Sequence, residues 1–169
     1  MGKSHLLKLI SASFILLIFT YSNVFAKSTD EKKFLKLVQE LSSQANKSIA
    51  EKDQYSEISY NFIKKIEKEF NVGKININKK AKADFYIIRC DIFAIFHKHD
   101  RQTIIDYCLE SDEFNTKNKI YKKKDYVFFE ILFAYIIAEN ALISFVYGNN
   151  LDNLNVAKKY IEKNLQLKN

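Results

Sequence analysis

The chain contains no proline and three glycines among its 169 residues, so few positions allow the backbone to turn sharply. Tight β-hairpin turns depend on residues that adopt positive φ, above all glycine. This scarcity disfavours a fold built from hairpins and favours helices. Gly73 and Gly148 both fall where an apolar helical pattern ends, which is the usual place for a left-handed residue that caps a helix.

The patterns that mark common chemistries are also missing. The sequence has no glycine-rich phosphate-binding loop, no nucleophilic serine flanked by glycines and no cysteines with zinc spacing. We therefore predict no catalytic residue, no metal site and no cofactor. The expected protein acts by binding and is not an enzyme.

Residues 1–26 resemble a secretory signal peptide. Lys3 and Lys8 precede the apolar run "LLKLISASFILLIF", and "VFA" ending at Ala26 places small residues where a signal peptidase cuts. The strongest apolar stretch, residues 10–19, is short for a membrane span. We predict export to the periplasm or the extracellular space, and a single helical domain over residues 27–169.

The expected mature chain is mildly basic, with 25 lysines and arginines against 20 acidic residues once Lys3 and Lys8 are removed. Exported proteins seldom meet nucleic acid, so we expect no nucleic-acid partner. A basic surface outside the cytosol suits an acidic protein or anionic lipid, and it also suits plain solvation.

Six segments carry the apolar spacing of helices that face a core. They lie at about 30–49, 55–70 and 79–97, and then from 101, at 126–147 and from 153. The break at 51–54 is weak, so one long bent helix remains an alternative there, and residues 74–78 are compatible with a brief strand. Asp100 is the expected N-cap of the fourth segment.

Apolar stripes indicate which helix faces point inward. The second segment carries Tyr55, Ile58, Phe62, Ile66 and Phe70 at helical spacing. The last segment carries Leu154, Ala157, Ile161 and Leu165 on one face. The third segment is apolar on nearly every side, which predicts a helix covered by others.

The fifth segment, residues 126–147, is long enough to raise the question of a membrane. Glu130, Glu139 and Asn140 interrupt it, and an acidic group at mid-bilayer costs about 2.5 to 3.5 kcal/mol on insertion scales. We predict a buried helix of a soluble protein.

The end of the fifth segment and the last segment, residues 141–167, together resemble a tetratricopeptide-type hairpin. Ala157 and Ile161 match packing positions of that repeat.

Both cysteines lie within "CDIFAIFHKHDRQTIIDYC", Cys90 to Cys108. Their midpoint falls at residue 99, in the expected turn between two antiparallel helices, so the sulfurs can lie at the same height. An even cysteine count in an exported chain favours a disulfide. A metal site from His97, His99 and Asp100 is the weaker alternative.

Arg89 lies on an apolar arc of its helix, where an unpaired guanidinium is costly. We expect it either to reach solvent along its aliphatic stem or to form a buried ion pair with Glu130 or Glu139. Glutamates in the apolar fifth segment need partners of their own.

A basic segment, "TKNKIYKKKDY" at residues 116–126, is a candidate docking patch for an acidic partner or for anionic lipid. Its lysines are Lys117, Lys119, Lys122, Lys123 and Lys124. A solvated linker is the alternative interpretation.

These observations predict an all-α protein of five to six helices, packed as consecutive antiparallel hairpins in an irregular bundle or short α/α solenoid, with one disulfide. The expected function is protein binding, as an assembly adapter or an immunity-type inhibitor. Binding of an apolar ligand or of a membrane surface is the alternative, and an envelope hydrolase ranks third.

Overall fold

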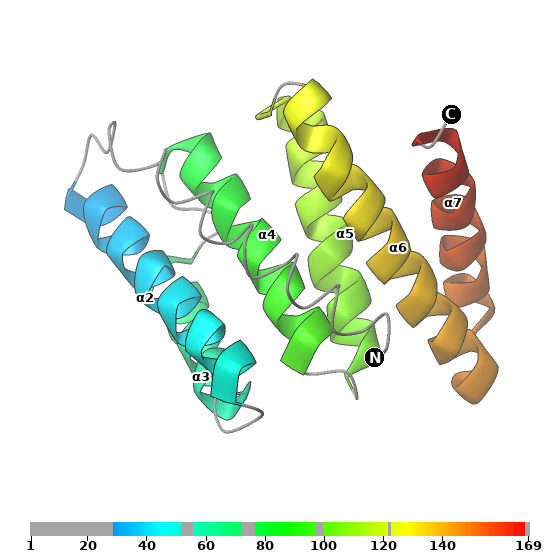
Figure 1. Ribbon diagram of the computed structural model, residues 1–169, viewed down its shortest axis with the longest axis horizontal. Coiled ribbons are helices and arrows are strands. Elements are labelled where there is room, and N and C mark those ends of the chain that lie inside the picture. The colour runs from blue at the N-terminus through cyan, green and yellow to red at the C-terminus, as the bar shows by residue number, and fades with distance from the viewer. Residues whose placement is uncertain (1–28, 52–55, 72–76, 97–99, 122, 168–169) are drawn as a thin grey trace. The chain divides into compact units, whose positions relative to one another are not determined.

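The computed structural model describes residues 29–51, 56–71, 77–96, 100–121 and 123–167, and these ranges contain helices and no strand. The helices are α2 (Thr29–Glu51), α3 (Ser56–Phe70), α4 (Lys79–Phe96), α5 (Arg101–Asn118), α6 (Lys123–Gly148) and α7 (Leu151–Leu167) (Figure 1). The all-α class is confirmed, and α2 and α3 are separate helices that pack together. The expected signal peptide, Gly73, His97 and His99 lie outside the described residues, as does most of the segment 74–78.

The chain divides into two compact units, Met1–Phe96 and His97–Asn169. Among the described helices, α2, α3 and α4 belong to the first unit, and α5, α6 and α7 belong to the second. A single domain over residues 27–169 stays a prediction.

Three aromatic rings from three helices meet in the core of the first unit. Phe34 of α2 makes edge-to-face contacts with Phe70 of α3 and Phe85 of α4, with ring centroids 5.3 Å and 5.6 Å apart. This geometry brings the positive edge of one ring to the negative face of the next. All three rings are buried, so they fix how α2, α3 and α4 pack together.

The helix α4 is covered on nearly every side, as its apolar sequence predicts. Its buried residues include the acidic Asp84 and Asp91 as well as its apolar side chains. Lys80, one turn earlier, places its Nζ 3.2 Å from Asp84 Oδ2 and compensates that charge. Both acidic side chains of this helix are therefore buried together with its apolar ones.

The buried face of α3 differs from the predicted stripe. Ser59 and Ile63 are buried with Ile66 and Phe70, whereas Ile58 is exposed. The face is shifted by one residue because the helix turns Ile63 toward the core in place of Phe62, which is half-buried.

Residues other than glycine take the left-handed caps. Asn71, Lys119 and Asn149 follow α3, α5 and α6 with φ of 41°, 49° and 54°. The amide of Asn149 donates to the Phe145 carbonyl over 2.7 Å, which closes the last turn of α6. The expectation that Gly148 caps this helix is wrong by one residue. Asp100 is confirmed as the N-cap of α5, since its Oδ1 accepts from the Thr103 amide at 3.2 Å.

In the second unit, α6 and α7 run side by side as an antiparallel hairpin (Figure 1). Ala141 of α6, Ala157 of α7 and Ile105 of α5 form its buried cluster, with Leu109 and Val156 packed against it. Alanines at this contact allow the helix backbones to approach closely.

Polar contacts set the rotation of α7 about its own axis. Asn153 Nδ2 donates to Ser144 Oγ of α6 over 2.8 Å and to Gln102 Oε1 of α5 over 3.2 Å. The buried residues of α7 are Asn153, Ala157 and Tyr160. Of the predicted inward stripe, only Ala157 is buried, and Ile161 and Leu165 are exposed.

Cys90 of α4 and Cys108 of α5 form a disulfide, as predicted. Both cysteines are fully buried. Such bonds persist in oxidising compartments and are rare in the cytosol, so the bond weakly indicates an exported protein.

Candidate interaction surface

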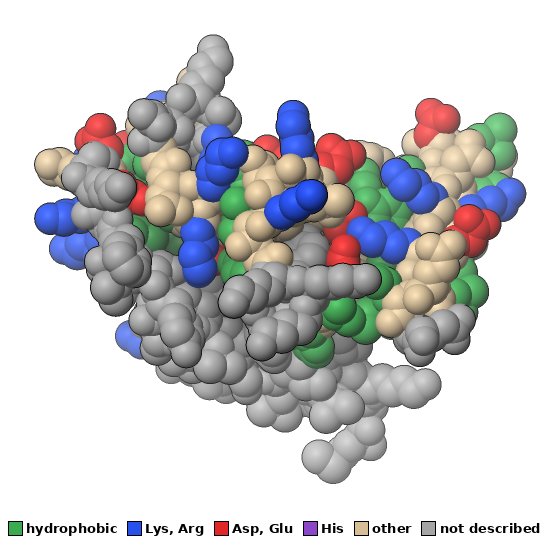
Figure 2. Space-filling view, turned by 90° about the horizontal axis from the view of Figure 1, so that it is seen from above, with side chains coloured by type: hydrophobic (Ala, Val, Ile, Leu, Met, Phe, Trp, Pro, Cys, Tyr) green, Lys and Arg blue, Asp and Glu red, His purple; other side chains and the backbone are tan. Residues whose placement is uncertain are grey.

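Large apolar side chains are exposed at eight positions of the described chain, and seven of them belong to α6 and α7. These seven are Tyr135, Leu142, Val146, Tyr147, Leu151, Ile161 and Leu165. The eighth is Ile58 of α3. On the right of Figure 2, where α7 lies in Figure 1, hydrophobic side chains are exposed among lysines and acidic residues. Because single exposed apolar residues are ordinary but a gathering of them is not, this hairpin is the candidate site.

The exposed residues of α6 recur at helical spacing. Tyr135, Glu139, Leu142 and Val146 are all exposed and follow one another at intervals of four, three and four residues. Residues at these intervals share one face of a helix. We call this set the α6 stripe.

A second stripe runs along α7. Leu151, Lys158, Ile161 and Leu165 are exposed, and Leu154 in the same row is half-buried. Their intervals of three and four residues again place them on one helix face. We call these five residues the α7 stripe. Each stripe thus contains one charged residue, Glu139 or Lys158, among apolar neighbours.

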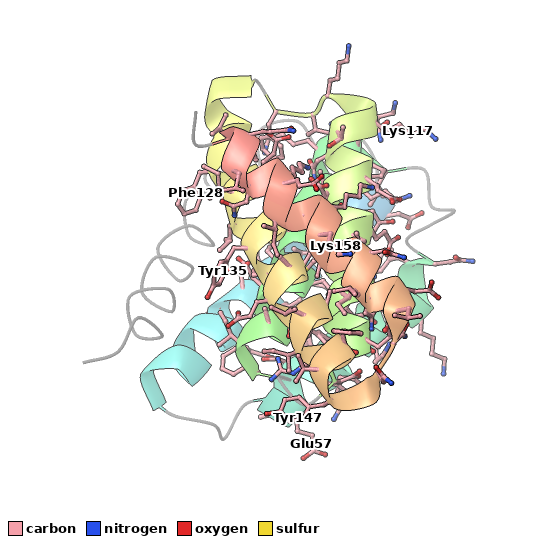
Figure 3. The ribbon with its side chains drawn as sticks, turned by 90° about the vertical axis from the view of Figure 1, so that its right-hand side faces the viewer. Glu57, Lys117, Phe128, Tyr135, Tyr147 and Lys158 are labelled. Carbon is pink, nitrogen blue, oxygen red and sulfur yellow. The ribbon has the colours of Figure 1, made fainter. Side chains whose placement is uncertain are left out.

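Both stripes lie on the side of the hairpin away from α5. The residues of the hairpin that bond to α5 come from other helix faces: Asn140 accepts from Arg101 Nη1 at 2.7 Å, and Tyr160 donates to Asp112 at 2.9 Å. Figure 3 shows Lys158 on the outer side of α7 and Tyr135 projecting from α6 away from α5. Together the α6 stripe and the α7 stripe form what we call the outer face.

The turn between the two helices forms an apolar tip. Val146, Tyr147 and Leu151 expose 66%, 85% and 67% of their surface, the largest values among the exposed apolar side chains of the described residues. Figure 3 shows Tyr147 at one end of the second unit and Lys117 at the other. The tip and the lysine segment are therefore two separate surfaces.

The helix α6 also satisfies the length and composition of a membrane span over Val127–Gly148. Half of its most apolar window is buried inside the protein, and core helices of soluble proteins share these properties. Its assignment as a buried helix of a soluble protein stays a prediction.

A buried polar cluster holds α7 against α5. Asp112 accepts from the Tyr160 hydroxyl at 2.9 Å and from Lys163 Nζ at 2.8 Å and 2.7 Å. Burial, and then the negative charge of Asp112, raise the pKa of Tyr160 well above its usual value of 10.0. Tyr160 therefore stays protonated at neutral pH and acts as a hydrogen-bond donor.

The predicted partner of Arg89 is wrong. Arg89 is buried, and its Nη1 lies 2.6 Å from Glu67 Oε1 of α3, while its guanidinium also lies over the rings of Tyr86 and Phe85 at 4.9 Å and 5.6 Å. Glu67 lies on a polar position of α3, so its neighbours in the sequence do not indicate that it pairs with a buried guanidinium. The pairing joins two helices of the first unit.

The two glutamates proposed for Arg89 have other surroundings. Glu130 Oε1 lies 4.0 Å from Lys163 Nζ, at the edge of the Asp112 cluster. Glu139 is exposed and bonds to Tyr135, whose pKa rises through burial and then through the charge of Glu139.

The lysine segment is described only in part. Lys117 lies in the last turn of α5 and Lys119 follows the helix, and both side chains are exposed. Lys122 lies outside the described residues. Lys123 and Lys124 begin α6, and the structure describes their backbone but not their side chains. Its role as a docking patch stays a prediction.

The outer face was missed at the level of sequence. The α7 stripe was assigned to the core because its apolar residues keep helical spacing. A signal that could have corrected this is the row of polar residues Asn153 and Tyr160, which need buried partners that α5 and α6 supply. Comparison with protein-family models, curated proteins and solved structures finds no match for this chain.

Proposed function

We propose that the chain is an exported helical protein that acts by binding another protein, with the outer face of the α6–α7 hairpin as its docking surface. The observation that carries this proposal is the concentration of exposed large apolar side chains on that hairpin. Contiguous apolar surface on a soluble protein marks an interaction site, and burying it is favourable by about 25 cal/mol per Å². Tyrosine, present here at positions 135 and 147, is enriched in protein interfaces.

Export is part of the proposal. The Cys90–Cys108 disulfide suits an oxidising compartment, and the first 26 residues have the charge and apolar pattern of a signal peptide. A periplasmic or extracellular binding protein, such as an assembly adapter or an immunity-type inhibitor, fits both features.

Photo-crosslinking in the producing cell tests the proposal. A photoreactive residue replaces Ile161 or Leu142 on the outer face, and a matched control replaces the exposed Glu40 of α2. We expect discrete protein adducts from the two hairpin positions and none from the control. Equal labelling at all three positions, or no protein adduct from the hairpin, would contradict the proposal.

Binding to a membrane surface is the second candidate, because the apolar tip exposes a tyrosine beside two aliphatic residues. Tyrosine favours the headgroup region, where one end of its ring is wet and the other apolar. A flotation assay with anionic vesicles tests this candidate. Co-flotation that Tyr147→Ser with Leu151→Ser abolishes would support it, and a protein that stays in the bottom fraction would exclude it.

A further inference from the structure

We propose that the protein docked on the outer face is a second copy of this chain, related by a two-fold axis that runs parallel to α6 and α7. This inference rests on the proposed function and names the partner of the same surface. It follows from the register of the hairpin and from the position of two charges.

Two hydrogen bonds fix the register. Asn153 Nδ2 donates to Ser144 Oγ over 2.8 Å near the tip, and Asn164 Nδ2 donates to the Ile131 carbonyl over 3.3 Å farther along. In an antiparallel pair, each step back along α6 matches one step forward along α7. Four residues of the α6 stripe are therefore level with four residues of the α7 stripe. The level pairs are Val146 with Leu151, Leu142 with Leu154, Glu139 with Lys158, and Tyr135 with Ile161.

A two-fold axis parallel to the helices exchanges the two stripes and leaves every residue at its own height. The α6 stripe of one copy then faces the α7 stripe of the other, and the reverse holds by symmetry. Every apolar residue of the level pairs meets an apolar residue. Glu139 meets Lys158 of the second copy twice across the interface.

The charges select this arrangement. Within the described part of the chain, neither Glu139 nor Lys158 forms an ion pair, although each lies between apolar residues of its stripe. Covering the outer face with an apolar surface would bury both charges unpaired, which is costly. The second copy supplies the opposite charge to each at the same level.

The competing symmetric arrangement is unfavourable. A two-fold axis perpendicular to the helices and centred at this level would place Lys158 against Lys158 and Glu139 against Glu139. Like charges opposed in an interface are destabilising, so the parallel axis is preferred. The result is a four-helix arrangement in which each α6 packs between two copies of α7.

The interface is small. The 17 residues of α7 span about 25 Å at 1.5 Å per residue, and the face is two helices wide. Such an area is near the lower end for specific complexes, so we expect a reversible dimer whose population rises with concentration.

Variants that reverse the charges of Glu139 and Lys158 test the inference, in the full exported chain with its disulfide intact. Sedimentation equilibrium measures the dimer dissociation constant of the unchanged protein and of Glu139→Lys, Lys158→Glu and the double variant. We expect each single variant to weaken the dimer at least tenfold by opposing like charges, and the double variant to recover most of the loss. Lys159→Glu changes an exposed lysine of α7 outside the stripe and serves as the matched control, with less than a threefold effect.

Three results would overturn the inference. They are a monomer at every concentration, a dimer that the single charge reversals leave unchanged, and a double variant no better than the single ones. The crosslinking experiment separates this failure from failure of the proposed function. Adducts of twice the chain mass indicate that the partner is a second copy of this chain. Adducts of another mass support the proposed binding of a protein and show that the outer face binds a different partner.

Discussion

At the scale of single residues, polar side chains decide how the helices of each unit meet. For Arg89, the sequence indicates the need for a partner but not which residue supplies it. Its apolar surroundings on the helix correctly indicate that it needs compensation if it is buried. The identity of Glu67 could not be deduced, because it depends on how α3 is rotated against α4, and that rotation is set by tertiary packing.

We expect Glu67→Gln to lower the free energy of unfolding by about 1 to 3 kcal/mol, because the buried guanidinium of Arg89 loses its counter-charge. The lower part of this range reflects the partial exposure of the Glu67 side chain. Urea unfolding followed by circular dichroism measures the change. Glu40→Gln, at an exposed position of α2, is the control and should change stability by less than about 0.5 kcal/mol.

The raised pKa of Tyr160 predicts that the protein loses stability in alkaline solution. Because its pKa is raised above 10.0 in the folded protein, the unfolded chain releases this proton first, and the free energy of unfolding falls as pH rises above about 10. Below that pH the group contributes no pH dependence. Lys33, whose pKa is raised by its hydrogen bond and ion pair with Glu69, contributes in the same direction.

Tyr160→Phe separates the two groups. We expect this variant to be less stable at neutral pH by about 1 kcal/mol, from the lost hydrogen bond to Asp112, and to show a shallower alkaline decline. Denaturant midpoints at a series of pH values provide the measurement. An unchanged alkaline slope would show that Tyr160 titrates normally.

At the scale of helices, apolar periodicity predicts that a helix is present and roughly where it begins and ends. It does not predict which face of the helix is buried. The N-cap at Asp100 and the covered state of α4 were predicted from local sequence and are confirmed. The predicted buried face of α7 was wrong. The hydrogen bonds of Asn153 and Tyr160 turn those residues inward and leave Ile161 and Leu165 exposed. Periodicity identifies an apolar stripe but does not identify what covers it.

The end of α6 gives a direct test of backbone conformation. Gly148 lies within the helix without positive φ, and a Cβ added there meets nothing within 4 Å. We expect Gly148→Ala to raise the free energy of unfolding by about 0.5 to 1 kcal/mol, because the unfolded chain loses freedom. Asn149→Ala should lower it by about 1 kcal/mol, because alanine tolerates φ near 54° poorly. Thermal unfolding of the two variants compares them, and a destabilising Gly148→Ala would contradict the structure.

At the scale of the whole molecule, the disulfide was the feature most accessible from sequence. Two cysteines equally distant from one predicted turn, in a chain with an expected export signal, leave a single pairing to consider. The division into two compact units was not anticipated, because neither a glycine-rich nor a proline-rich linker marks the boundary near residue 97.

Replacing both Cys90 and Cys108 by alanine should lower the free energy of unfolding by about 2 to 4 kcal/mol, because the unfolded chain regains the freedom of the closed loop. Guanidinium unfolding of the variant and of the oxidised protein measures the difference. Reduction of the unchanged protein should give a similar loss, which controls for the change in side-chain volume.

The position of this bond also determines what a protease can release. Any single cut between Cys90 and Cys108 severs the backbone while the sulfurs still hold the two fragments as one covalent species. The nicked protein would migrate as a single band until a reductant is added and as two bands afterwards. One cut between the two cysteines therefore leaves the fragment that contains α2 and α3 bonded to the fragment that contains α6 and α7.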